Sequence, residues 1–234
     1  MKKAALRVVI LSVTVLGYAA SASAHGMAPA EQVPSVQQLF EAGQYDRAAE
    51  AIAALRREAS PPPVLADAYL AGQVFLRLNQ PDRAKQEFAR LTSAADPVWR
   101  LTGESAVALA DRNFDGALDR VTEAATQLAA AEAAAGQNAG PAAARRPVEA
   151  FHVSYQTGLV KAARMEWAGA AAAFERAALL QPTFAYAHYY AGLAYSNIRR
   201  PDQVALHFER FLSLAPNAPE RPAVLSIMRT IRGR

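Results

Sequence analysis

The sequence contains no cysteine and, once its first residues are set aside, no excess of either charge. Without cysteine the chain forms no disulfide and carries no lipid on an N-terminal cysteine, so its stability must come from packed secondary structure. The chain has 25 Lys and Arg against 21 Asp and Glu, but three of the basic residues are Lys2, Lys3 and Arg7. The remaining balance of 22 (25 minus 3) against 21 provides no concentrated basic face, and we expect no nucleic-acid partner.

Long apolar runs are also lacking. The strongest run, residues 8–16, is too short to span a bilayer; it follows the short basic region and precedes the small-residue pattern Ala22-Ser23-Ala24. This arrangement is typical of a secretory signal peptide over residues 1–24, and an uncleaved membrane anchor is the less favoured alternative. We expect a bacterial protein that is periplasmic or secreted, with no membrane span after signal cleavage.

Signatures of enzymes are missing as well. The segment 103–107, Gly-Glu-Ser-Ala-Val, approaches a nucleophile elbow but lacks its closing glycine and has no strand before it. No phosphate-binding loop, dinucleotide fingerprint or His-Glu-x-x-His pattern occurs. We therefore predict that the protein is not an enzyme, with no catalytic residue, no cofactor and no metal site.

Histidine offers an alternative chemistry. If the signal is cut after Ala24, His25 becomes the N-terminus, and its amine and imidazole would chelate copper as in the histidine brace of lytic polysaccharide monooxygenases, which it resembles in this single residue. A brace needs a second histidine nearby, and His152, His188 and His207 show no ligand spacing. We expect His207 to be exposed. Copper handling through His25 remains an alternative function, and an accessory subunit of a periplasmic enzyme complex is another.

What the sequence has instead is a repeat. Three residues recur at an offset of 34 (192 minus 158 for the glycines): Gly158, Phe174 and Pro182 in one copy, and Gly192, Phe208 and Pro216 in the next. Gly72 and Phe88 keep the separation of 16 between glycine and phenylalanine that both copies show. We expect the glycine to let one helix approach its partner closely and the aromatic ring to fill the groove between them.

These residues resemble the tetratricopeptide repeat (TPR) superfamily, whose units are pairs of antiparallel helices with a Gly-x2-Tyr, Ala-x3-Phe, Pro skeleton. The resemblance covers nearly all of residues 35–234; it is specific in the copies that start near residues 65, 151 and 185 and loose in the other two. It implies an all-α, right-handed α-solenoid of about five helical hairpins. A helix opened by Pro222 then covers the last repeat as a C-terminal cap, with a membrane-surface role for its arginines as the alternative.

The predicted organisation has five parts. They are a signal peptide over 1–24, a flexible N-terminal arm over 25–34, N-terminal TPR-like repeats over 35–135, a flexible insert over 136–147, and C-terminal repeats with the capping helix over 148–234. The insert is either a joint between two repeat arrays or a surface loop on one continuous solenoid.

In TPR proteins the inner groove is lined by fixed positions of the first helix of each hairpin. Carried over by spacing, those positions hold these residues: Tyr69, Gln73, Arg77, Trp99, Thr102, His152, Tyr155, Leu159, Tyr186, Tyr189, Leu193 and Asn197. The Lys and Asn arrangement that grips a terminal carboxylate in chaperone-binding members is not present. The resemblance implies a non-catalytic scaffold that binds a protein or peptide of the cell envelope in an aromatic groove. In the alternative interpretation these aromatic residues pack hairpin against hairpin.

Overall fold

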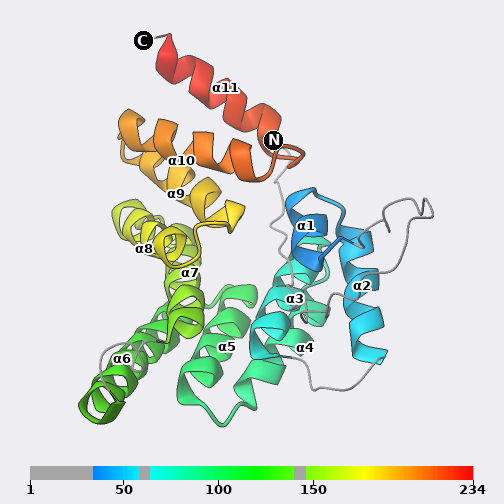
Figure 1. Ribbon diagram of the computed structural model, residues 1–234, viewed down its shortest axis with the longest axis vertical. Coiled ribbons are helices and arrows are strands. Elements are labelled where there is room, and N and C mark those ends of the chain that lie inside the picture. Colours follow the sequence, from blue (N-terminus) through cyan, green and yellow to red (C-terminus); the bar gives the residue numbers. More distant parts are fainter. Residues whose placement is uncertain (1–33, 58–63, 140–145, 234) are drawn as a thin grey trace, which may run out of the picture.

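The structure, a computed structural model, describes residues 34–57, 64–139 and 146–233, and every regular element in these ranges is a helix. Figure 1 shows their arrangement. The helices of the described ranges are α1 (Val36–Glu41), α2 (Tyr45–Arg57), α3 (Leu65–Arg77), α4 (Pro81–Thr92), α5 (Pro97–Ala110), α6 (Phe114–Ala139), α7 (Pro147–Ala163), α8 (Trp167–Leu180), α9 (Ala185–Asn197), α10 (Pro201–Leu214) and α11 (Arg221–Arg232).

Consecutive helices pair as hairpins. Helix α1 packs with α2, α3 with α4, α5 with α6, α7 with α8, and α9 with α10, while α11 packs on α10. Each hairpin also packs on the next one, for example through α4 with α5 and α8 with α9. The described chain is therefore an α-solenoid of five hairpins with an additional C-terminal helix, which confirms the predicted fold class.

The five hairpin turns share one backbone conformation. Each turn contains a residue in the left-handed region, with φ of 74° at Gly43, 57° at Asn79, 63° at Arg112, 62° at Met165 and 57° at Arg199. The next amide donates to a carbonyl five residues back, as Gln80 N does to Phe75 O at 2.8 Å. This bond satisfies a carbonyl at the end of the first helix and reverses the chain, so the second helix folds back against the first.

The repeated glycines lie against the repeated phenylalanines. A Cβ atom added at Gly72, Gly158 or Gly192 would stand 2.3, 2.6 or 2.5 Å from a ring carbon of the paired phenylalanine. The paired rings are fully buried: Phe88, Phe174 and Phe208. The steric reason predicted for the 16-residue separation is therefore confirmed.

The insert predicted over 136–147 is shorter in the structure. Helix α6 continues through 136–139, and α7 already begins at Pro147; residues 140–145 lie outside the described ranges, as do 1–33 with the predicted signal peptide and all of the arm except Pro34. The alanine-rich sequence after Leu128 explains the extension, because alanine has the highest helix propensity and a single glycine costs only about 1 kcal/mol. Among the described helices, none combines the length and the apolar character that a membrane crossing requires.

Candidate functional site

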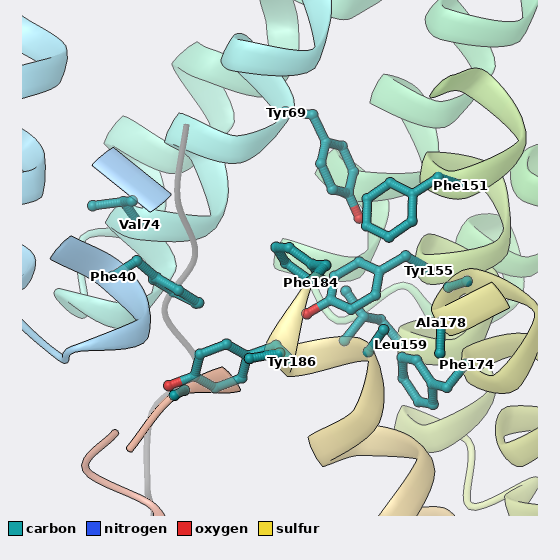
Figure 2. Close-up of a cluster of buried hydrophobic side chains, with 14 of the residues drawn as sticks. Phe40, Tyr69, Val74, Phe151, Tyr155, Leu159, Phe174, Ala178, Phe184 and Tyr186 are labelled. Carbon is teal, nitrogen blue, oxygen red and sulfur yellow. The ribbon is translucent and has the colours of Figure 1, made fainter. Parts of the chain in front are cut away.

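The first hairpin returns to the last repeat, so the solenoid closes across its concave side. The ring of Phe40 in α1 lies 4.6 Å, between centroids, from the ring of Tyr186 in α9. The turn of the same hairpin touches the loop between α10 and α11, because a Cβ at Gly43 would stand 2.9 Å from Cδ of Pro219. Figure 2 shows Phe40 and Tyr186 meeting Tyr155 and Phe184 in one cluster of buried side chains. We call these contacts between the first hairpin and the last repeat the closure.

One contact of the closure is a helix cap supplied from a distant hairpin. The backbone N–H of Ala185, the first residue of α9, donates to Oε1 of Glu41 at 3.0 Å, and the N-cap residue of α9, Phe184, makes no side-chain cap of its own. Burial raises the pKa of Glu41 from 4.5 to about 7, although the bond from Ala185 opposes the shift. Because the folded state holds this proton more tightly, Glu41 contributes stability that is present below pH 4.5 and lost as the pH rises through 7.

Arg77 in α3 is the buried charge of this interior. Its side chain is almost fully buried, and Nη1 lies 2.7 Å from Oε1 of Glu220 at the N-cap of α11. Its Nη2 donates to the hydroxyl of Tyr190 at 3.1 Å, and the hydroxyl of Tyr186 donates to the other oxygen of Glu220 at 2.7 Å. The guanidinium also lies 4.7 Å from the ring centroid of Tyr186. These bonds tie α3 to α9 and to the start of α11.

A second polar chain runs through the interior on the side of α5 and α7. The hydroxyl of Tyr69 donates to Oε1 of Gln156 at 2.7 Å, Nε2 of Gln156 donates to Oγ of Ser105 at 3.1 Å, and Ser105 donates to the carbonyl of Ala117 at 2.8 Å. All three side chains are buried. Ser105 stands where the repeat pattern expects glycine, and the structure gives the reason: its hydroxyl both accepts and donates within this chain.

Because of the closure, most of the predicted groove residues are buried. Seven of them are buried: Tyr69, Gln73, Arg77, Trp99, His152, Tyr155 and Tyr186. Tyr189 is partly buried, 5.7 Å from Tyr186 between ring centroids, and Asn197 is exposed at the end of α9, where its amide donates to Leu193 O at 2.9 Å. Of the further positions, Thr102 and Leu159 are buried and Leu193 is partly buried. The first hairpin covers the concave side, so these residues lie in a covered interior in this structure; peptide binding by them stays a prediction.

Among the buried polar atoms of this interior that lack a hydrogen-bond partner in the described part of the chain, two belong to uncharged side chains. They are the hydroxyl oxygen of Tyr155, a residue with 0% exposure, and Oε1 of Gln73. Burial raises the pKa of Tyr155 well above its usual value, so the hydroxyl keeps its proton and remains a donor. Figure 2 shows the Tyr155 side chain extending toward Phe40 and Tyr186. The interior therefore holds one unused donor and one unused acceptor, each costing about 1–3 kcal/mol.

His152 is a packed residue of this interior. Its ring centroid lies 5.1 Å from that of Tyr69 and 4.8 Å from that of Trp99, and its Nδ1 lies 2.7 Å from the carbonyl of Val148. Burial lowers the pKa of His152 to about 4, while the bond to Val148 opposes the shift. The ring is therefore neutral at pH 7, and Nδ1–H donates to the carbonyl.

The other two helical histidines lie next to each other. Nδ1 of His188 lies 3.2 Å from Nδ1 of His207, and Nε2 of His188 lies 3.3 Å from the carbonyl of Pro182. His207 is 4% exposed, so its predicted exposure was wrong; the ring of Tyr195 stacks on it, 5.5 Å between centroids. No group of three or more potential metal ligands occurs among the described residues, and His25 lies outside them.

Sequence reasoning missed the residues that make the closure. Phe40, Glu41 and Glu220 lie on the first hairpin and at the start of α11, and none occupies a groove position of the repeat pattern. Ala185 and Glu41 are 144 residues apart along the chain. Such contacts depend on the curvature accumulated over the intervening hairpins, which leaves no local signal in the sequence.

Comparison with known proteins bears on the fold. No protein-family model matches the sequence, and no curated protein matches it. Among solved structures, the chain is similar to one in the crystal structure of the APC/C hetero-tetramer Cut9–Hcn1, with a TM-score of 0.50 and 16% identity, covering 80% of this chain and 33% of that one. It is also similar to MamA of AMB-1, with a TM-score of 0.40 and 18% identity, covering 79% of this chain and 90% of that one. The chain thus spans about a third of the Cut9–Hcn1 chain, and at this identity the likeness establishes the fold alone.

Proposed function

Because the chain has a TPR-like α-solenoid fold, we propose that it is a non-catalytic scaffold that holds a segment of a partner protein against its concave side. The observation that supports this proposal is the pair of buried polar atoms without partners in the described residues, on Tyr155 and Gln73. A backbone segment carries both N–H and C=O groups, so one segment supplies an acceptor for the hydroxyl and a donor for the amide oxygen. The surrounding rings would bury the apolar side chains of the same segment.

Entry of a segment requires the closure to open. The first hairpin covers the concave side through Phe40 and through the cap that Glu41 provides to α9. Helix α2 packs on α3, so the first hairpin remains attached to the solenoid when these contacts to α9 break. We propose that a partner segment replaces the first hairpin at α9 and that the protein alternates between a closed state and an open, occupied state.

We also propose that the protein acts in the bacterial periplasm or cell envelope, on a component of secretion or envelope assembly. The support is the pattern over residues 1–24, with its basic start, short apolar run and small residues before His25. In this proposal the partner segment belongs to a protein exposed in the same compartment.

A reversible lock on the closure tests the proposal. Exposed Gln44 and Asn217 line the groove where the first hairpin meets the loop after α10, and the chain has no cysteine to compete with introduced thiols. A Gln44→Cys, Asn217→Cys double variant joined by a reducible cross-linker is held closed. We expect the cross-linked protein to recover less of its partner from a bacterial envelope extract than the same protein after reduction, by quantitative mass spectrometry.

A second cysteine pair, placed outside the closure, controls for effects of the cross-linker that do not depend on the closure. Nζ of Lys85 in α4 lies 2.9 Å from Oδ1 of Asp111 at the C-cap of α5, and neither residue belongs to the first hairpin or the last repeat, so a Lys85→Cys, Asp111→Cys pair with the same cross-linker leaves the first hairpin free. Recovery should be equal before and after reduction in this control. Equal recovery in the Gln44→Cys, Asn217→Cys variant would contradict the proposal.

A further inference from the structure

A separate groove with aliphatic and polar side chains lies at the C-terminal end of the solenoid. It occupies about 810 Å³ between the turn that joins α9 to α10, the start of α10 and the second half of α11. Val204 of α10 and Ile227 and Ile231 of α11 contribute aliphatic side chains to it. Arg199 and Arg200 of the turn form one end.

The groove exists because α11 diverges from α10. Val224 and Met228 of α11 are buried, whereas Ile227 and Ile231 are only partly buried. Figure 1 shows the two helices close together at the start of α11 and farther apart toward its end. Because Ile227 and Ile231 are four residues apart, they form one aliphatic ridge along the groove.

The charge at the end of the groove is positive. Arg199 and Arg200 are exposed, and neither takes part in an ion pair within the described ranges 34–57, 64–139 and 146–233. Hydrogen bonds from Gln203 and, to a smaller extent, the charge of Arg200 lower the pKa of Asp202, so this carboxylate offsets part of the positive charge. The net charge of these three side chains is positive, which favours an acidic occupant.

We propose that this end groove binds an acidic amphipathic helix of a partner protein. Aliphatic residues at i, i+4 and i+7 of that helix would pack on the partly buried Ile227 and Ile231, above the buried Val204, and its Asp or Glu side chains would lie at the arginine end. This surface is separate from the concave side, so binding here needs no opening of the closure. A membrane fits less well, because the isoleucines line a groove rather than a convex face.

A pair of synthetic peptides tests the charge preference. The acidic probe is a labelled helix-forming peptide with leucine at i, i+4 and i+7 and glutamate on its other faces; the control replaces every glutamate with lysine. We expect the protein to bind the acidic peptide at least about tenfold more tightly, as measured by fluorescence anisotropy. The affinity should fall as salt is raised, since salt screens exposed charge pairs. Equal binding of the two peptides would overturn the proposal.

Variants on the two sides of α11 locate the binding. Ile227→Asp places a charge in the groove and should weaken acidic-peptide binding at least about tenfold, and Arg199→Glu should weaken it too. Leu225→Asp and Arg221→Glu change exposed residues of α11 that line a different surface pocket, so the affinity for the acidic peptide should stay at the parent level. Circular dichroism checks that each variant is folded.

The remaining outcomes separate other occupants. Unchanged binding in Ile227→Asp would overturn the groove as the site. Sedimentation gives a second outcome: if the parent protein self-associates without peptide and Ile227→Asp does not, a second copy of the chain is the occupant and the proposal is overturned. Tighter association of the parent than of Ile227→Asp with anionic vesicles, without peptide binding, would assign the face to a membrane instead. Peptide binding that survives the cross-link between positions 44 and 217 would distinguish this groove from the concave side.

Discussion

Two equally buried tyrosines of the interior differ in what their hydroxyl groups contact. Tyr186 donates to Glu220 at 2.7 Å, whereas the hydroxyl of Tyr155 has no partner among the described residues. A buried hydroxyl that loses its bond with water and gains none in the protein costs about 1–3 kcal/mol. The same substitution should therefore have opposite effects at the two positions.

We expect Tyr155→Phe to raise the free energy of unfolding by about 1 kcal/mol, because it removes an unpaired hydroxyl and little volume. Tyr186→Phe, the matched control, should lower the free energy of unfolding by about 1–3 kcal/mol, because it removes the hydroxyl that donates to Oε2 of Glu220. Urea unfolding followed by circular dichroism measures both. A loss of stability in Tyr155→Phe as large as that in Tyr186→Phe would show that the Tyr155 hydroxyl is paired.

Some residue conformations were readable from the sequence and others were not. Gly43 and Asn79 belong to the residue types that tolerate the left-handed region, so their place in the turns is understandable from local preference. Arg112, Met165 and Arg199 have no such preference, and yet they adopt the same conformation. Their backbone is set by the packing of the two helices that each turn joins, which a local reading of the sequence does not contain.

At the scale of the helices, the repeated spacing was sufficient to predict the hairpins. The separation between Gly158 and Phe174 reflects a contact between two neighbouring helices, so the constraint stays within about one repeat. The end of α6 was not predicted, because helix propensity continues through alanine-rich sequence and Gly136 does not stop the helix. Short-range sterics therefore predicted which helices pair but not where each one ends.

The glycine contact predicts the result of a single added methyl group. A Cβ at position 158 would stand 2.6 Å from ring carbons of Phe174, and that ring is already stacked on Tyr190 at 5.2 Å between centroids. We expect Gly158→Ala to lower the free energy of unfolding by about 1–3 kcal/mol despite the better helix propensity of alanine. Thermal or urea unfolding gives the value.

Gly169→Ala in the same hairpin is the control. The nearest atoms to its added Cβ belong to the flexible end of Lys161, with Cδ at 2.9 Å, so this side chain can move away. We expect no loss of stability, or a gain of up to about 1 kcal/mol from helix propensity. Equal effects of the two substitutions would mean that Phe174 can retreat from the glycine.

At the scale of the whole molecule, the sequence predicted the repeats but not the closure. The resemblance selected side chains that the structure does gather on one side of the solenoid, such as Tyr69, Arg77 and Tyr186. Whether that side is open depends on where the first hairpin lies relative to α9, and this position results from several small rotations between successive hairpins. The repeat pattern does not predict the size of these rotations, so it does not predict the closure.

The ion pair between Arg77 and Glu220 adjoins the closure, because the guanidinium of Arg77 also lies 5.0 Å from the ring centroid of Phe40. Glu220→Gln removes the charge that compensates Arg77, and we expect it to lower the free energy of unfolding by about 3 kcal/mol. We also expect the first hairpin to separate from the last repeat, so spin labels at positions 44 and 217 should show a longer and broader distance distribution. Asp111→Asn, which breaks an exposed pair with Lys85, should leave the free energy of unfolding nearly unchanged, because exposed ion pairs are screened by water. An unchanged label distance in Glu220→Gln would refute the role given to this pair.

The closure also alters how a repeat protein comes apart. In an open solenoid each hairpin contacts only its neighbours, so terminal repeats fray from either end almost independently. Here the first hairpin caps α9 through Glu41 and contacts Tyr186, so it cannot melt without exposing the interior of the last repeat. The start of α11 is held as well, because Glu220 at its N-cap pairs with Arg77 of α3 and accepts from Tyr186 of α9, while the helix packs on α10. We therefore expect the first and last hairpins to unfold together rather than to fray independently from the two ends.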